Sequence, residues 1–165
     1  MAKTFLLVVA AIAAVMAALA ILPGISRQGG DLTIDYQKDS VIRGDSGDYE
    51  NLDRDLLTIN NDGSARHVKL DGQGKVVGEK RFSITGEELK VLKELFLGTG
   101  FMQIPENSYV ERMGLANFTR YELTVKSGED SQTIRWVNPE AGNGNIPSIV
   151  INAGTRLDAI IERSS

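Results

Sequence analysis

The chain has 165 residues, with 22 acidic and 18 basic side chains, a formal net charge of −4, one histidine and no cysteine. This charge balance disfavours nucleic acid and anionic lipid headgroups as partners, because both require a basic surface. The lack of cysteine excludes disulfides and thiolate metal sites. A folded domain of this chain must therefore be stabilised by the packing of its core.

An uninterrupted apolar run covers residues 5–22, after Lys3 and before Pro23. As a helix this run would extend about 27 Å, enough to cross the hydrocarbon core of a bilayer. It predicts a transmembrane anchor over residues 1–23, and the positive-inside rule places the C-terminal remainder of the chain outside the cytoplasm.

A cleaved signal peptide is the alternative interpretation of the same run. Ala18-Leu19-Ala20 has the small-x-small pattern of a cleavage site, and cleavage after Ala20 would release a secreted protein. Both interpretations export the remainder of the chain. Residues 24–30 have the composition of a short flexible linker, and residues 31–165 are long enough for one hydrophobic core and too short for two.

The first half of this domain has the pattern of a strand meander. Apolar and polar residues alternate over 32–36, which predicts a half-buried strand, and the polar stretch from there to residue 53 predicts a loop. Turn sequences follow at 60–63 and 71–74, with alternating segments on either side. We expect antiparallel strands joined by these turns.

A helix is predicted over residues 86–97. Thr85 stands three residues before Glu88, which is the capping-box pattern, and leucines then recur at helical spacing. Gly98 is the expected left-handed residue at its end.

A second hairpin and a second helix complete the domain. The hairpin is predicted over residues 121–136 around a turn at 127–130, and the helix follows Pro147. Gly154 interrupts the apolar pattern of this helix and indicates close packing.

These elements predict an α+β fold. An antiparallel sheet of about five to six strands, in the order β-β-β-β-α-β-β-α, has two helices packed on one face. The opposite face is expected to be in contact with water, because charged and hydroxyl side chains are interleaved with the apolar ones, namely Thr119, Arg120, Glu122, Thr124 and Lys126.

Three segments resemble a known family: ITGEELKVLKELFLGTGFMQIP, RYELTVKSGEDSQTIRWV and the closing helix after Pro147. Over roughly residues 54–163 their spacing and apolar pattern are similar to the emfourin-type inhibitors of thermolysin-like metalloproteases, and equally to a group of secreted bacterial α+β domains. The resemblance implies the α+β fold and, for the emfourin type, inhibition through loops inserted into a protease active site.

Catalytic signatures are absent from the sequence. His67 alternates with the apolar Val68 and Leu70, so we expect it to face solvent on a strand. No Ser/His/Asp arrangement and no phosphate-binding glycine loop can be assembled from the residue order. The sequence predicts a protein that is not an enzyme and has no cofactor.

One metal site is predicted from the acidic loop before residue 56. Five carboxylates crowd together there, and a hard cation such as calcium would relieve their repulsion, although the spacing is not that of an EF-hand. A solvated acidic loop without an ion is the alternative. The residues are Asp45, Asp48, Glu50, Asp53 and Asp55.

Two surface features complete the prediction. Asn117-Phe118-Thr119 is an acceptor sequence for N-linked glycosylation. In the irregular segment 98–116, Tyr109, Val110 and Met113 either pack on the domain or form an apolar loop that contacts another protein.

We therefore expect a membrane-tethered extracytoplasmic binding domain without catalytic activity, which contacts another envelope protein. Inhibition of a thermolysin-like metalloprotease is the alternative, and a calcium-binding surface domain is the third.

Overall fold

The computed structural model describes residues 31–105 and 107–164. The predicted membrane or signal segment and the linker, residues 1–30, lie outside these ranges. Within them, neither helix combines the length and the hydropathy that a bilayer span requires.

The predicted α+β fold is confirmed for the described domain. A six-stranded antiparallel sheet has the spatial order β4-β3-β2-β1-β5-β6, so the first strand lies at its centre. The chain order is the predicted one, with one helix after the fourth strand and one after the sixth. The strands are β1 Leu32–Arg43, β2 Tyr49–Asn60, β3 Ser64–Asp71, β4 Val76–Ser83, β5 Asn117–Ser127 and β6 Asp130–Val137.

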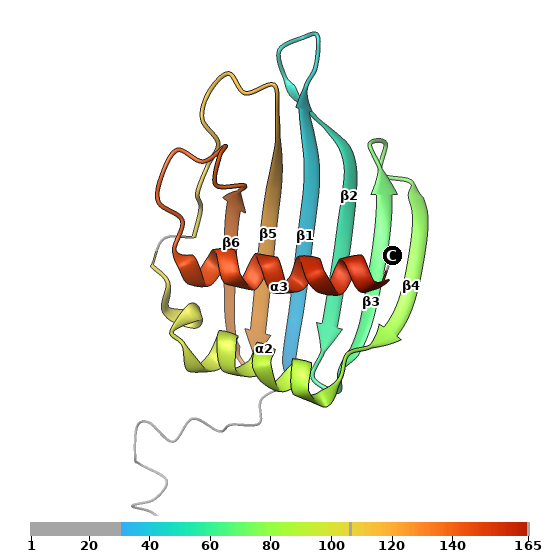
Figure 1. The fold of residues 1–165 in the computed structure, drawn as a ribbon, viewed down its shortest axis with the longest axis vertical. Helices are drawn as coiled ribbons and strands as arrows, with labels where there is room; N and C mark the ends of the chain where they lie inside the picture. The colour runs from blue at the N-terminus through green and yellow to red at the C-terminus, as the bar shows by residue number, and fades with distance from the viewer. Residues whose placement is uncertain (1–30, 106, 165) are drawn as a thin grey trace, which may run out of the picture. The chain divides into compact units, whose positions relative to one another are not determined.

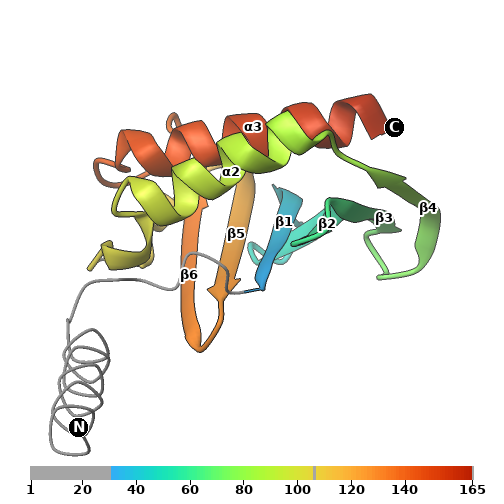
Figure 2. The ribbon, with the colours of Figure 1, turned by 90° about the horizontal axis from the view of Figure 1, so that it is seen from below.

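Both helices cover the same face of the sheet (Figures 1 and 2). Helix α3, Ser148–Ser164, crosses the strands, whereas α2, Gly86–Gly98, follows one end of the sheet. A short 3-10 helix η1, Phe101–Gln103, follows α2 and inserts Phe101 into the core against Phe96.

The start of α2 has the predicted capping box. The backbone N–H of Glu88 donates to Thr85 Oγ1 at 3.2 Å, and the N–H of Thr85 donates to Glu88 Oε2 at 2.9 Å. The helix ends one residue later than predicted, and the predicted position of the left-handed glycine was wrong by two residues. Gly98 is still helical, and Gly100 has the left-handed conformation, with φ of 83°.

The main core lies between the sheet and the two helices. It is built from alternate residues of the central strands and from the apolar stripes of the helices, as the sequence periodicity predicts. Gly154 lies where α3 meets the sheet, and a Cβ there would come within 2.9 Å of Trp136. The fully buried side chains include Leu32, Ile34, Tyr36, Leu57, Ile59, Phe96, Phe101, Leu123, Ile134 and Leu157.

The loop predicted as far as residue 53 is mostly strand. β1 continues to Arg43 and β2 begins at Tyr49, so only residues 44–48 form the turn. Polar side chains of β1 and β2 form hydrogen bonds with one another across the two paired strands. Arg54 donates to Asp39 at 2.7 and 3.1 Å, and Ser40 donates to Asp53 at 2.8 Å.

The expectation of an entirely wet second face was wrong. A small second cluster of buried side chains lies there, and Tyr49 and Leu115 pack against it. The remainder of that face carries ion pairs, such as Arg135 with Glu122 at 2.6 Å. The buried members of the cluster are Val41, Phe118, Val137 and Ala141.

The two edges of the sheet differ. Beside β6, the backbone of Tyr109 donates to Arg135 at 2.8 Å and Arg135 donates to Asn107 at 2.9 Å, so a segment of the chain covers that edge. β4 is the last strand on the other side, and among the described residues no strand pairs with its outer edge.

Candidate functional site

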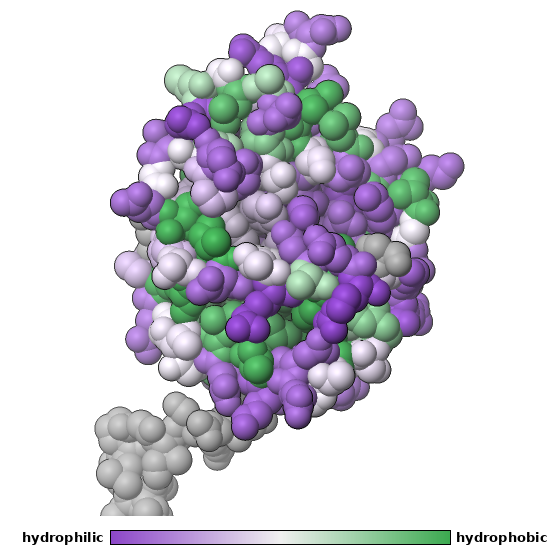
Figure 3. Space-filling model, viewed as in Figure 1, coloured by the Kyte–Doolittle hydropathy of each residue, from purple (hydrophilic) through white to green (hydrophobic). Residues whose placement is uncertain are grey.

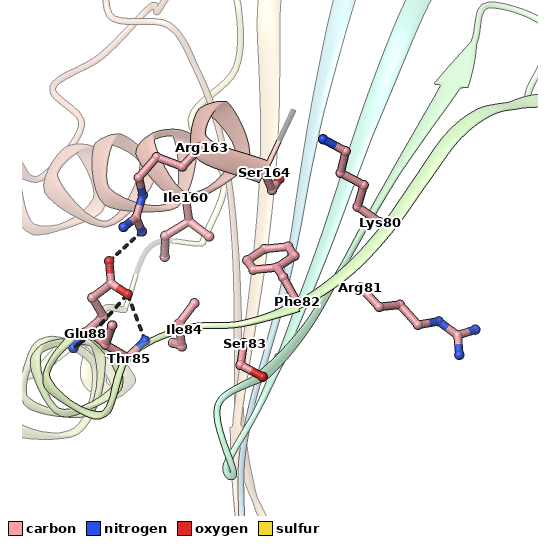
Figure 4. Close-up of a pocket in the computed structure, with 10 residues that line it drawn as sticks. All are labelled: Lys80, Arg81, Phe82, Ser83, Ile84, Thr85, Glu88, Ile160, Arg163 and Ser164. Carbon is pink, nitrogen blue, oxygen red and sulfur yellow. Dashed lines mark hydrogen bonds and ion pairs between the residues drawn. The ribbon is translucent and has the colours of Figure 1, made fainter.

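A cleft of about 420 Å³ opens beside β4, where that strand leads into α2 and where α3 ends. Three elements that are far apart in the sequence contribute to it, namely the end of β4, the first turn of α2 and the last turn of α3 (Figure 4). The lining residues are Lys80, Arg81, Phe82, Ser83, Ile84, Thr85, Glu88, Ile160, Arg163 and Ser164.

The floor of the cleft is apolar. Phe82, Ile84 and Ile160 project toward one another in Figure 4. Ile84 and Ile160 belong to the main core, and Phe82 packs against it while remaining partly exposed. The cleft is therefore a shallow opening through which the apolar core can be reached beside the strand edge.

The rim is polar and charged. Arg163 forms an ion pair of 2.5 Å with Glu88 across the gap between α3 and α2. The hydrogen bond from the backbone N–H of Thr85, assisted by Arg163, holds the pKa of Glu88 below its usual value although partial burial opposes the shift. Lys80 projects to the helix side of β4 and Arg81 projects away from it (Figure 4), as alternation along a strand requires.

A buried Asp-His-Ser chain of hydrogen bonds lies next to the cleft. His67 Nε2 is 2.7 Å from Asp55 Oδ1, and His67 Nδ1 is 3.1 Å from Ser164 Oγ in the last turn of α3. The expectation that His67 faces solvent was wrong, because the residue is only 6% exposed. The side chain of His67 points to the face of β3 opposite Val68, as predicted, but α3 covers that face.

The hydrogen bonds among Asp55, His67 and Ser164 connect the end of α3 to the sheet. Ser164 Oγ donates to the carbonyl of Ile161 at 2.8 Å, and the two ring nitrogens of His67 contact Ser164 Oγ and the Asp55 carboxylate. Because the hydroxyl of Ser164 donates to a backbone carbonyl and not to His67, the arrangement is not that of a serine activated by a base. The serine also lies at a helix C-terminus, whose partial negative charge opposes an oxyanion.

A second polar connection ties α3 to the centre of the sheet. Tyr36 donates to Asp158 at 3.0 Å, and Lys38 forms an ion pair with the same carboxylate at 3.2 Å. Burial, reinforced by the charge of Asp158, raises the pKa of Tyr36 far above its ordinary value. Tyr36 therefore stays neutral and acts as a hydrogen-bond donor.

The structure distributes the five predicted calcium ligands over different elements. Asp45 and Asp48 lie in the β1–β2 turn, whereas Glu50, Asp53 and Asp55 lie along β2. Asp53 accepts from Ser40 and Asp55 contacts His67. In residues 31–105 and 107–164, no three His, Cys, Asp or Glu side chains are grouped to hold a metal ion.

The predicted partner-contact residues are also separated. Tyr109 is buried in the main core, while Val110 and Met113 are exposed on the segment beyond it. Asn117, the predicted glycosylation site, is the exposed first residue of β5.

The cleft was not predicted from the sequence, although the sequence of β4 indicates a strand at the edge of a sheet. Its sequence VVGEKRFS has no regular apolar alternation, and all of its residues except Phe82 are exposed in the structure. A strand without a buried face is typical of a sheet edge.

The remaining side chains on the helix-bearing face form no large continuous apolar surface. Hydrophilic side chains cover much of it and separate the apolar patches (Figure 3). No protein-family model matches the chain, and no curated protein matches its sequence.

Proposed function

We propose that this chain is a membrane-tethered extracytoplasmic domain that acts by binding another envelope protein and performs no chemistry of its own. The observation that carries the proposal is the outer edge of β4, which no strand of the described residues pairs with and which lies beside a cleft with an apolar floor. Unpaired strand edges are templates for a further strand, and peptide-binding domains use them in this way.

The contrast between the two sheet edges supports this proposal. A segment of the chain covers the edge at β6, and both the N–H and the carbonyl of the β6 residue Arg135 are hydrogen-bonded to that segment. The β4 edge has no such cover in the described part of the chain, and Val76 and Val77 are exposed along it. An edge left open beside a cleft is the surface best suited to a partner.

The proposed location rests on the apolar run over residues 5–22, which has the length of a membrane span. A retained anchor would hold the domain at the membrane, and cleavage after Ala20 would release it. In both cases the β4 edge would meet proteins outside the cytoplasm.

Photocrosslinking in cells tests the proposal. A photoreactive amino acid replaces Val77, which is 59% exposed on β4, in the full-length chain. We expect an adduct with another envelope protein after irradiation. The control places the same group at Val91, an exposed valine of α2, and should give no adduct. Equal crosslinking from both positions, or none from Val77, would contradict the proposal.

Inhibition of a thermolysin-like metalloprotease is the second candidate function. The three segments that resemble the emfourin-type inhibitors favour it, and the β1–β2 turn extends beyond the neighbouring strands as a loop (Figure 1). Such a loop has the form needed to enter an active site. Mixing residues 31–165 with a thermolysin-like protease tests it, and undiminished peptide cleavage at micromolar excess of the domain would exclude this candidate.

A further inference from the structure

We propose that the segment bound at this edge is an extended acidic peptide, which adds as a strand to β4 and places one apolar side chain in the cleft. This inference rests on the proposed function and names the chemistry of the partner. It follows from the direction of the side chains of β4 and from the charge around them.

The first argument is the geometry of strand addition. A strand paired with β4 would lie about 4.8 Å from it, and its alternate side chains would point to the helix-bearing face. On that face it would meet the apolar floor made by Phe82, Ile84 and Ile160. A branched aliphatic or aromatic side chain suits this floor, because burying it would remove apolar surface from water.

The second argument is the local charge. Residues 31–165 contain 22 acidic and 16 basic side chains, so the domain as a whole repels acidic partners. Around the β4 edge the balance is reversed, since β3, the β3–β4 turn, β4 and the cleft lining together carry six basic and three acidic side chains. The basic ones are Arg66, Lys69, Lys75, Lys80, Arg81 and Arg163, and the acidic ones are Asp71, Glu79 and Glu88.

The ion pairs at this edge leave positive charge uncompensated. Arg66 and Arg81 share the single carboxylate of Glu79, at 2.9 and 3.3 Å, so two guanidinium groups face one acid. Their side chains are 53% and 78% exposed, which leaves their remaining N–H groups accessible to a bound carboxylate.

The chain's own N-terminal residues do not have this chemistry. Residues 1–30 contain no aspartate or glutamate, so they do not supply the acidic segment. A second copy of the chain could offer its own acidic β1–β2 turn, and the identity of the adduct crosslinked at Val77 separates that occupant from a different protein.

The experiment measures peptide binding to the full-length chain in detergent micelles by fluorescence anisotropy. The probe is a labelled extended peptide of eight residues, the length of β4, with glutamates around one leucine. We expect it to bind, and we expect affinity to fall about tenfold when the glutamates become glutamines and about tenfold when the leucine becomes serine. Methylation of its backbone nitrogens should abolish binding, because a strand pairs through them.

Variants of the chain complete the test. The pair Lys80→Glu and Arg81→Glu should weaken binding at least as much as neutralising the peptide does. Lys90→Glu with Lys93→Glu changes the charge equally on α2, away from the lining of the cleft, and should leave binding unchanged. Equal affinity for the acidic and the neutral peptide would overturn the inference.

Failure of this inference can be separated from failure of the proposed function. If the group at Val77 still crosslinks to an envelope protein while acidic and neutral peptides bind equally, the binding function stands and the acidic specificity is wrong. If Val77 yields only an adduct of two copies of this chain, self-association accounts for the edge and the inference is overturned. If Val77 yields no adduct, the proposed function fails.

Discussion

Asp55, His67 and Ser164 illustrate at the residue scale how a polar chain can fix a helix to a sheet. The Asp55 side chain is 13% exposed and accepts from a histidine whose other nitrogen reaches the end of α3. Replacing His67 by leucine removes both hydrogen bonds and leaves a mostly buried carboxylate. We expect the free energy of unfolding to fall by about 1–3 kcal/mol.

Urea unfolding of residues 31–165, followed by the fluorescence of the single tryptophan Trp136, measures this loss. The control is the double variant Asp55→Leu and His67→Leu, in which no charge is left buried. A pair of apolar residues often replaces a buried ion pair without loss, so the double variant should be more stable than the single one. The opposite order would show that Asp55 does not depend on His67.

Gly154 lies so close to Trp136 that a larger residue there should destabilise the fold. Alanine there would gain about 1 kcal/mol of helix propensity, but its Cβ would lie 2.9 Å from Trp136 Cζ2. Overpacking of a core costs about 1–3 kcal/mol, so we expect a net loss of stability. Gly98→Ala is the matched control, since nothing lies within 4 Å of its Cβ, and it should be neutral or stabilising. Thermal unfolding of both variants decides, and an equally stable Gly154→Ala would contradict the close approach.

At the scale of elements, the sequence was most informative where a pattern is local. The capping box of α2, the turns before Ser64 and Val76 and the apolar stripe of α3 depend on neighbouring residues, and the structure confirms all of them. The extension of β1 and β2 was missed because their polar residues become favourable only when paired across the ladder. In the sequence Asp39 is typical of a loop, but in the sheet it lies opposite Arg54 and accepts a hydrogen bond from it.

The site was harder to predict for the same reason. The cleft is lined by β4, α2 and α3, which meet only after the sheet has formed. Alternation correctly separated His67 from Val68, but periodicity alone does not say which face of β3 a later helix covers. Ser164 comes 97 residues after His67, and nothing local connects them.

The charge of Glu88 at the N-terminus of α2 should make the stability of the protein depend on pH. The pKa of Glu88 is lowered in the folded protein, so its contribution to stability is fully present above its ordinary value of 4.5 and is lost as the pH falls through the lower folded value. Glutamine at position 88 can keep the capping hydrogen bond but carries no charge. We therefore expect Glu88→Gln to weaken the dependence of stability on pH below 4.5.

Thermal unfolding between pH 6 and about pH 3 measures this dependence. Glu87→Gln is the matched control, since Glu87 lies in the same helical turn and is exposed. It should retain the steeper acid dependence of the unchanged protein. If both variants have the same profile as the unchanged protein, the charge of Glu88 does not stabilise this helix end.

The sequence contains no cysteine, which makes the proposed location of the domain testable by thiol labelling. A single introduced thiol is therefore an unambiguous reporter of the side of the membrane on which it lies. Met113 is suited to this use, because its side chain is 101% exposed and lies outside both helices and all six strands. Val150, which is fully buried in α3, provides the control.

The proposed location outside the cytoplasm predicts that Met113→Cys reacts with a membrane-impermeant maleimide in intact cells, whereas Val150→Cys should react only after denaturation. Ala2→Cys then distinguishes the two interpretations of residues 5–22. A retained anchor keeps this thiol in the membrane fraction, on the cytoplasmic side, where it is labelled only after lysis. A cleaved signal peptide removes the thiol, so the mature chain cannot be labelled at all. Labelling of Met113→Cys only after lysis would place the domain in the cytoplasm, and the β4 edge would then have no envelope protein to bind.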